Sequence, residues 1–152
     1  MDHMSSKDMT PVFASTELRL HPVDYMIVST PLGEKEKALE VFKSLEPFSS
    51  ITLDTEEVSL ILEVEDWETI KDNFGEYLVE GPYNAITFDI VLDLSLVGYL
   101  SVVSAVLADA GVSIYAVSTY LRDHILVKSE DVDTAMKVLG DLIKRCKLTI
   151  NE

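Results

Sequence analysis

The segment 111–127 combines side chains and backbone features that could hold a small charged ligand. It runs Gly-Val-Ser-Ile-Tyr-Ala-Val-Ser-Thr-Tyr-Leu-Arg-Asp-His-Ile-Leu-Val, and it predicts two strands joined by a polar bend. Asp123 follows the bend directly, and its carboxylate suits a charge-assisted hydrogen bond to an ammonium group or a cationic side chain. The chemistry expected at this bend is recognition of a positive group.

A helix expected over residues 96–110 offers the complementary chemistry at its start. The first turn, over residues 95–100, has free backbone N–H groups and the positive end of the helix dipole, which favour a carboxylate. Gly98 lies in this turn and lets a ligand approach the backbone closely. A free amino acid carries a carboxylate and an ammonium group close together, so the helix start and the bend together fit such a ligand. Ser113 and Ile114, expected on a strand, could offer backbone groups to a ligand across an interface with an adjacent module.

Each of these residues also has a structural interpretation that the sequence leaves open. Gly98 fits close packing of a helix on a sheet, and Asp123 fits an ordinary turn position. His124 alternates with apolar Ile125, so it is expected to face solvent or a subunit rather than a metal. The remaining candidates are compatible with ordinary or solvent-facing strand positions: Ser113, Thr119 and Tyr120.

The elements that position this site are the second copy of a repeated pattern. Aligning Gly33 with Gly98, an offset of 65 residues, brings further identical residues into register without a gap. These pairs are Asp24 with Asp89, Val41 with Val106, Glu65 with Glu130, Asp66 with Asp131 and Thr69 with Thr134. Polar identities in a fixed register are hard to obtain from apolar periodicity alone, so the pattern predicts two duplicated units. Coincidence between two apolar patterns is the alternative.

Each unit is expected to have βαββαβ order. In the first unit we expect strands over 25–29, 49–53, 58–64 and 77–79, with helices over 32–45 and 66–74. In the second unit we expect a strand over 85–92, the helix over 96–110 capped by Asp93 or Ser95, the hairpin, a helix over 131–145 and a closing strand over 148–150. The predicted fold class is α+β, with two ferredoxin-like units, each an antiparallel sheet with helices on one face.

The predicted domain boundaries follow from this order. The first unit is expected over residues 17–80 and the second over 84–150, with Gly81-Pro82 marking the junction. Residues 1–16 show no apolar period and are expected to be a disordered lead-in or an expression remnant.

Composition excludes several classes of partner. The 152 residues include 27 acidic and 12 basic side chains, a net charge of −15, whereas a nucleic-acid backbone or an anionic membrane requires clustered Lys and Arg. No apolar run reaches the length of a membrane span, and the N-terminus lacks the pattern of a signal peptide. Cys146 is the only cysteine and cannot form an internal disulfide, so we expect a cytoplasmic protein.

Catalytic and metal-binding motifs are missing from the sequence. There is no phosphate-binding glycine loop, no Gly-x-Ser-x-Gly elbow and no His-Glu-x-x-His pair. Three histidines, one of them in the expected lead-in, offer few general bases, and no spacing of His, Cys or carboxylates resembles a metal site. The expectation is a protein that is not an enzyme and that holds no cofactor or metal.

Three runs carry a resemblance to a known family. They are Leu-Asp-Leu-Ser-Leu-Val-Gly-Tyr-Leu at 92–100, Leu-Ala-Asp-Ala-Gly-Val-Ser-Ile-Tyr-Ala-Val-Ser-Thr-Tyr at 107–120 and Asp-His-Ile-Leu-Val at 123–127. They resemble the second half of small tandem ACT-domain proteins, including the ACT modules of CASTOR-type arginine sensors. The segments Ser-Ile-Thr at 50–52 and Glu-Val-Ser-Leu at 57–60 are similar to the first half. The resemblance implies a regulatory module that binds an amino acid at an interface between domains.

This sequence also departs from the family pattern. Arg122 stands where relatives often have a small hydroxyl residue, and Ile90-Val91 replaces an expected Gly-Pro. Val58 in the first unit occupies the place of Asp123, so only the second unit is expected to keep the full binding signature. The candidate amino-acid-binding residues are Gly98, Tyr99, Leu100, Ser113, Ile114, Ser118, Thr119, Tyr120 and Asp123.

The function expected from these observations is that of a non-catalytic, amino-acid-binding regulatory protein. We expect a homodimer that holds its ligand between modules and acts on a downstream partner protein. The main alternative is an interaction scaffold, in which the same surfaces bind a protein and no ligand enters. A weaker alternative is an enzyme subunit that acts on amino acids.

Overall fold

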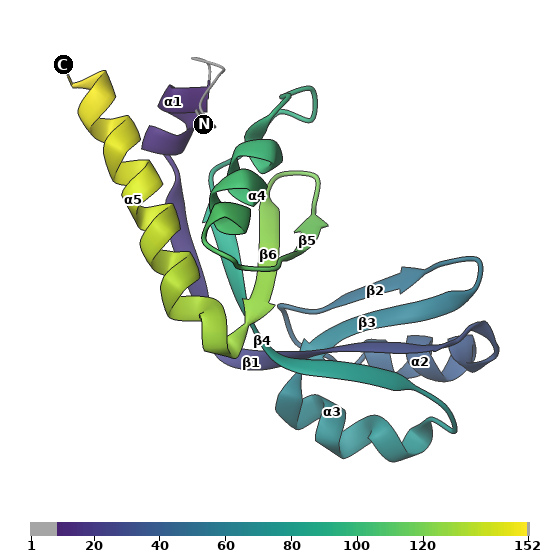
Figure 1. Cartoon of the computed structure of the whole chain (residues 1–152). Coiled ribbons are helices and arrows are strands. Elements are labelled where there is room, and N and C mark those ends of the chain that lie inside the picture. Colours follow the sequence, from purple (N-terminus) through teal and green to yellow (C-terminus); the bar gives the residue numbers. More distant parts are fainter. Residues whose placement is uncertain (1–8, 152) are drawn as a thin grey trace. The chain divides into compact units, whose positions relative to one another are not determined.

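The structure, a computed structural model, describes residues 9–151 and has an α+β fold with antiparallel strand pairs (Figure 1). Its helices and strands are α1 (Met9–Ala14), β1 (Glu17–Pro31), α2 (Lys35–Phe42), β2 (Ser50–Leu53), β3 (Glu57–Glu63), α3 (Val64–Ile70), β4 (Leu78–Asp89), α4 (Tyr99–Asp109), β5 (Tyr115–Ser118), β6 (Asp123–Lys128) and α5 (Val132–Ile150). The strand order is β2-β3-β1-β4-β6-β5.

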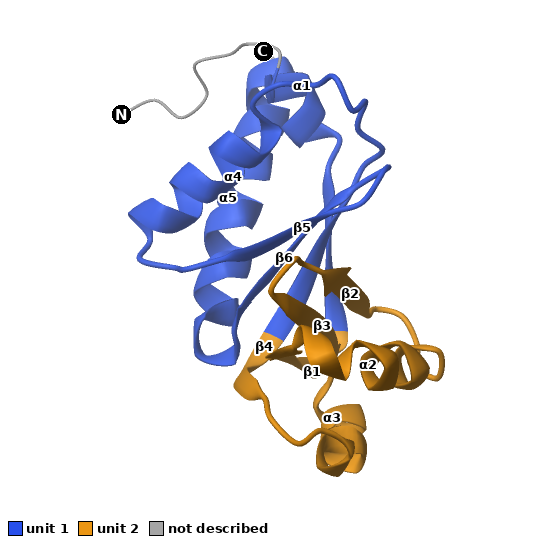
Figure 2. Ribbon diagram, turned by 90° about the vertical axis from the view of Figure 1, so that its right-hand side faces the viewer, with its two compact units in different colours: residues 1–21, 84–152 blue, residues 22–83 orange. Residues whose placement is uncertain are grey.

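The chain divides into two compact units, shown in blue and orange in Figure 2. Unit 1 takes residues up to His21 and from Asn84 onward, and unit 2 takes Pro22–Tyr83. The division cuts both β1 and β4, so each of these strands serves both units. Unit 1 therefore includes a segment, up to His21, that sequence analysis assigned to the first unit or to the lead-in.

Unit 2 has the element order β1-α2-β2-β3-α3-β4. Strand β3 pairs antiparallel with both β1 and β2, with Tyr25 opposite Glu63 and Ser50 opposite Ile61. The apolar face of this sheet packs on α2 and α3 around Trp67, whose ring lies 6.2 Å from that of Phe74. The core of the unit consists of Val28, Ala38, Val58, Leu60, Leu62, Trp67 and Phe74.

Unit 1 takes its sheet from β1, β4, β6 and β5 and its core from helices α1, α4 and α5. Ile86 and Phe88 of β4 belong to this core, as do alternate residues of β6. Because side chains alternate along a strand, Thr87 and His124 lie on the opposite face of the sheet. Helix α4 adds the apolar residues Tyr99, Val102, Val103 and Leu107, and α5 adds Ala135, Leu139, Leu142 and Cys146.

The prediction of a disordered lead-in over 1–16 is wrong for its described part, and residues 1–8 lie outside the described residues. Residues 9–14 form α1, with Met9 and Phe13 each only 1% exposed. The ring of Phe13 stacks on Tyr99 of α4 at 4.4 Å. A six-residue helix has too few turns to show an apolar period, and it is stabilised by its contacts with the rest of the unit.

Three further expectations about elements need correction. Residues 148–150 end helix α5 instead of forming a strand. Gly81-Pro82 lies inside β4, which joins the two short strands expected at 77–79 and 85–92 into one. Ser113 and Ile114 lie in the loop between α4 and β5, not on a strand.

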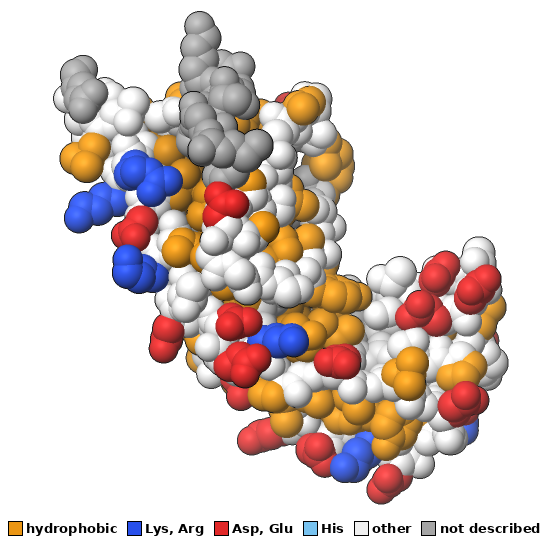
Figure 3. All heavy atoms as spheres, in the orientation of Figure 1, with side chains coloured by type: hydrophobic (Ala, Val, Ile, Leu, Met, Phe, Trp, Pro, Cys, Tyr) orange, Lys and Arg blue, Asp and Glu red, His pale blue; other side chains and the backbone are white. Residues whose placement is uncertain are grey.

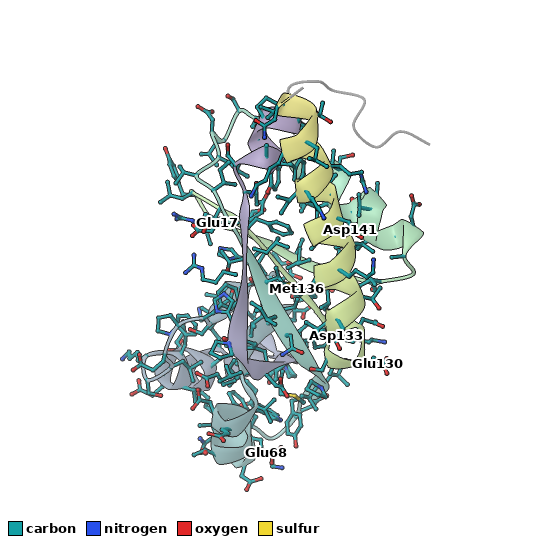
Figure 4. All side chains as sticks on the ribbon, turned by 90° about the vertical axis from the view of Figure 1, so that its left-hand side faces the viewer. Glu17, Glu68, Glu130, Asp133, Met136 and Asp141 are labelled. Atoms are coloured by element: carbon teal, nitrogen blue, oxygen red, sulfur yellow. The ribbon has the colours of Figure 1, made fainter. Side chains whose placement is uncertain are left out.

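Helix α5 carries many of the exposed charged residues of unit 1. Asp133 and Asp141 are exposed on this helix (Figure 4), and the basic residues gather toward its C-terminal end (Figure 3). These basic residues are Lys144, Arg145 and Lys147, which complement the negative end of the helix dipole. Within residues 9–151, no helix combines the length and apolarity needed to cross a membrane.

Candidate amino-acid site in unit 1

The start of α4 and the bend between β5 and β6 together line a cavity of about 360 Å³. A cavity of this size lies within the range of small-molecule sites. Seven of the nine residues predicted from the sequence line it: Gly98, Tyr99, Leu100, Ser118, Thr119, Tyr120 and Asp123. The fold thus brings together two segments that are about twenty residues apart in the sequence.

The first turn of α4 presents backbone N–H groups to this cavity. Gly98 is the N-cap residue and has a φ of 103°, in the left-handed region that favours glycine. No described side chain caps this helix, and the first intrahelical bond runs from Val102 N to the Gly98 carbonyl at 3.2 Å. The N–H groups of Tyr99, Leu100 and Ser101 therefore precede the first intrahelical bond, which suits them to an anion.

The expectation that Asp93 or Ser95 caps this helix is wrong. The Asp93 carboxylate accepts hydrogen bonds from the Ser95 backbone N at 2.8 Å and from its hydroxyl at 2.6 Å. These bonds lower the pKa of Asp93 below its usual value. Both residues are occupied in a local turn three residues before the helix begins, because an Asp side chain readily closes such a turn.

The bend holds Asp123 in a defined place. The Ser118 hydroxyl donates a hydrogen bond to the Asp123 carboxylate at 2.7 Å, and the bend closes through Thr119 N to the Arg122 carbonyl at 2.9 Å. The loop that leads to α4 is tied to the same bend by a bond from Leu92 N to the Leu121 carbonyl at 2.9 Å. This backbone hydrogen bond therefore ties the loop before α4 to the bend that carries the Asp123 carboxylate.

Tyr99 links the start of α4 to the segment that follows α1. Its side chain is buried, and its hydroxyl lies 2.9 Å from Thr16 Oγ1, which itself donates to the Val12 carbonyl. The Tyr99 hydroxyl is therefore the donor in their bond. Burial raises the pKa of Tyr99 strongly, and the nearby negative charge of Asp123 raises it further. Sequence analysis missed Thr16 because it lay in the segment expected to be disordered.

Arg122, the departure noted in the sequence, lines the cavity, but its Nε atom bonds to Asp89 at 3.0 Å. Asp89 also lies 3.6 Å from the guanidinium of Arg19. The Asp123 carboxylate instead accepts a hydrogen bond from the Ser118 hydroxyl, which is a neutral group. The aligned identity of Asp89 with Asp24 gave no hint of this role.

The two predicted residues that do not line the cavity are Ser113 and Ile114. They belong to the loop after α4, and their role at an interface with another module stays a prediction. The rim carries exposed apolar side chains. Tyr120, a predicted site residue, is 76% exposed, and two residues that the sequence did not single out are also exposed: Leu94, at 67%, and Val97, next to lining residue Gly98, at 84%. Exposed large apolar groups gathered around a cavity are typical of an interaction surface.

The corresponding part of unit 2 has different chemistry. Val58, which aligns with Asp123, is fully buried in the core. Gly33, which aligns with Gly98, lies in a short 3-10 turn at Leu32–Glu34. A cavity of about 280 Å³ in this unit has three glutamates among its lining residues: Glu56, Glu57 and Glu76. No group of three or more His, Cys, Asp or Glu residues within 9–151 is placed to hold a metal ion.

Part of the chain is similar to a known family of domains. Residues 79–141 match the family model of the ACT domain. The matched segment contains α4, the bend and every residue that lines the cavity. Among curated proteins, none matches this sequence significantly.

Solved structures of similar fold include proteins from three bacteria. A protein of unknown function from Vibrio cholerae, described as a possible transport protein, is 25% identical, with 90% of this chain and 97% of that chain covered and a TM-score of 0.71. A protein from Agrobacterium tumefaciens is 22% identical, with coverages of 84% and 89% and a TM-score of 0.69. The ligand-free regulatory subunit of aspartate kinase from Thermus thermophilus is 12% identical, with coverages of 84% and 97% and a TM-score of 0.60. The latter two likenesses show a shared fold.

Proposed function

We propose that this protein is a non-catalytic regulatory protein that binds a free amino acid in the cavity between α4 and the β5–β6 bend. The observation that carries the proposal is the pairing of free N–H groups at the α4 start with the Asp123 carboxylate in one cavity. The match to the ACT domain over residues 79–141 supports the same function, because such modules are regulatory and bind amino acids.

The expected mode of binding follows from charge. The ligand carboxylate lies against the N–H groups of Tyr99, Leu100 and Ser101, where the helix dipole favours an anion. The ligand ammonium group pairs with Asp123, whose other contact is the neutral hydroxyl of Ser118. In this mode the ligand is held by hydrogen bonds and charge alone, so the role that we propose for the site is recognition.

We further propose that unit 2 is a second ACT-like unit, and that it does not bind an amino acid. The repeat at 65 residues and the element order β1-α2-β2-β3-α3-β4 support its relation to the second half of the chain. Buried Val58 in place of Asp123 leaves it without the carboxylate that would hold the ammonium group. This unit would then serve as a structural partner.

An interaction scaffold is the alternative that a specific observation favours. The exposed apolar rim at Leu94, Val97 and Tyr120 suits a protein partner whether or not a ligand enters. In the proposed function, a second copy of the chain covers this rim and closes the cavity. Ligand binding therefore distinguishes the two functions.

A thermal-shift screen against the twenty amino acids, followed by calorimetry with the best ligand, tests the proposal. Asp123→Asn keeps the size of the side chain and removes its charge, and it should weaken binding by about 2–5 kcal/mol. Asp133→Asn is the matched control, because Asp133 is exposed on α5 outside the cavity, and it should leave affinity unchanged.

Two outcomes would count against the proposal. Uniform indifference to all amino acids would favour the scaffold. Binding by Asp123→Asn that is as tight as in the parent would remove this carboxylate from the site.

A further inference from the structure

A second cleft, of about 360 Å³, lies beside the bend and is lined by polar and cationic residues of unit 1. Arg19 and His21 come from β1, Thr87 from β4, Arg122 from the bend and His124 from β6. Strand alternation places His124 on the face of the sheet opposite Ile125, which is buried in the core. The cleft is thus distinct from the amino-acid cavity, although residues of the bend line both.

The two histidines belong to a chain of hydrogen bonds whose direction can be assigned. The Thr119 hydroxyl donates to the Arg122 carbonyl at 3.0 Å, so it can only accept from His124 Nε2 at 3.4 Å. In neutral His124 the other ring nitrogen, Nδ1, then carries no hydrogen and accepts from the Thr87 hydroxyl at 2.9 Å. Thr87 in turn accepts from His21 Nε2 at 2.7 Å.

Two arginines lie beside this chain and share one carboxylate. Arg122 Nε lies 3.0 Å and Arg19 Nη2 lies 3.6 Å from the same oxygen of Asp89. One carboxylate therefore faces two guanidinium groups, each of which has five N–H donors. The Arg19 side chain is 56% exposed and that of Arg122 30%, so both can be reached by a ligand. In a chain of net charge −15, this concentration of cationic groups is unusual.

We propose that this cleft binds a small oxyanion, a carboxylate or a phosphate, held by Arg19 and Arg122 and flanked by His21 and His124. The planar guanidinium group matches the geometry of such anions. The bound anion would balance the charge that Asp89 alone leaves uncompensated. This site goes beyond the proposed function, because it requires no amino acid in the cavity on the other face.

The histidines give this site a characteristic dependence on pH. Burial and the charge of Arg19 lower the pKa of His21, and burial and the nearby His21 and arginines lower the pKa of His124 despite Asp123. The carboxylates near these groups are Asp89, which pairs with both arginines, and Asp123, which precedes His124 in the chain. A bound anion favours the protonated histidines, so binding should take up protons and tighten as pH falls.

Calorimetry with sodium sulfate, against sodium chloride of equal ionic strength, tests the proposal at about pH 5.5 and about pH 7.5. Sulfate is the probe because its charge is constant between these values, and sodium acetate in a parallel titration distinguishes a carboxylate ligand from a phosphate-like one. We expect sulfate or acetate binding that is tighter at the lower pH, with proton uptake detected as a heat that depends on the buffer.

Matched variants assign the binding to the cleft. Arg19→Gln should weaken binding at least about tenfold, because a charge-assisted bond is lost, and Arg19→Lys should retain part of it. Arg145→Gln removes the same charge from exposed α5 and should bind like the parent. His21→Asn should reduce the proton uptake.

The proposal is overturned if neither anion binds beyond the chloride control at either pH. It is also overturned if Arg19→Gln, shown to be folded by its thermal transition, binds both anions as tightly as Arg145→Gln does.

Discussion

His21 and His124 illustrate how single residues couple this fold to protons. Both side chains belong to one hydrogen-bonded chain, and burial and nearby positive charges lower both pKa values below the ordinary 6.5. Below about pH 6.5 the unfolded chain therefore binds more protons than the folded chain does. The contribution of these two histidines to the free energy of unfolding should be fully present above this pH and should decrease as the pH falls below it.

This dependence can be measured by urea unfolding between about pH 7.5 and about pH 5.5. The double variant His21→Asn, His124→Asn should show a flatter dependence of the free energy of unfolding on pH than the parent. Glu63 has a pKa raised chiefly by burial, so it acts with the opposite sign, in the more acidic range around its ordinary 4.5. An unchanged slope in the double variant would show that the two histidines are not responsible.

At the same scale, the sequence predicted the residues of the amino-acid cavity better than those of the second cleft. Gly98 and Asp123 were found because a helix start and a turn have local signatures, and the fold brings both to one cavity. His21 was an isolated residue in the sequence, since it meets Thr87 and His124 only through the pairing of β1, β4 and β6. Such contacts between distant strands leave no local pattern.

Among the elements, β4 depends on a glycine inside a strand. Gly81 has a φ of 150°, and a Cβ there would lie 2.5 Å from Met26 Sδ and 3.0 Å from the Tyr25 carbonyl oxygen. Gly81→Ala should therefore destabilise the protein by about 1–3 kcal/mol. Gly140 lies within α5 with open space around it, so Gly140→Ala should stabilise by about 1 kcal/mol.

Chemical unfolding of Gly81→Ala, Gly140→Ala and the parent measures these two opposite changes in the free energy of unfolding. Equal stability of Gly81→Ala and the parent would mean that the strand adapts to a side chain at this position.

The long strands show why element boundaries were harder to predict than element types. The sequence indicated short strands at 25–29, 77–79 and 85–92, and the structure extends them into β1 and β4. The outer part of β1 is mostly exposed, so its residues have no continuous apolar pattern. Gly81-Pro82 was interpreted as a turn from composition alone, whereas its place beside Met26 and Tyr25 is decided by packing.

For the whole molecule, we predict a homodimer formed through the rim of the amino-acid cavity. Val97→Glu introduces a charge at an apolar residue that is 84% exposed, and it should shift the protein toward the monomer. Leu148→Glu is the control, since Leu148 is a comparably apolar, exposed residue on α5 outside the rim. Light scattering at high micromolar concentration measures both, with and without ligand. A monomeric parent under both conditions would contradict the prediction.

The division into units has a consequence for the order in which the chain can fold during synthesis. Unit 2 is one continuous segment, Pro22–Tyr83, so all of its residues are made before Asn84, where the second part of unit 1 begins. The core of unit 1 joins Met9 and Phe13, which are made before unit 2, to Leu142 and Cys146, which are made after it. Helix α1 therefore cannot complete this core until unit 2 and helix α5 have both been translated. Until then the apolar face of α1 stays exposed to solvent, so we expect the nascent chain to bind a chaperone at this stage.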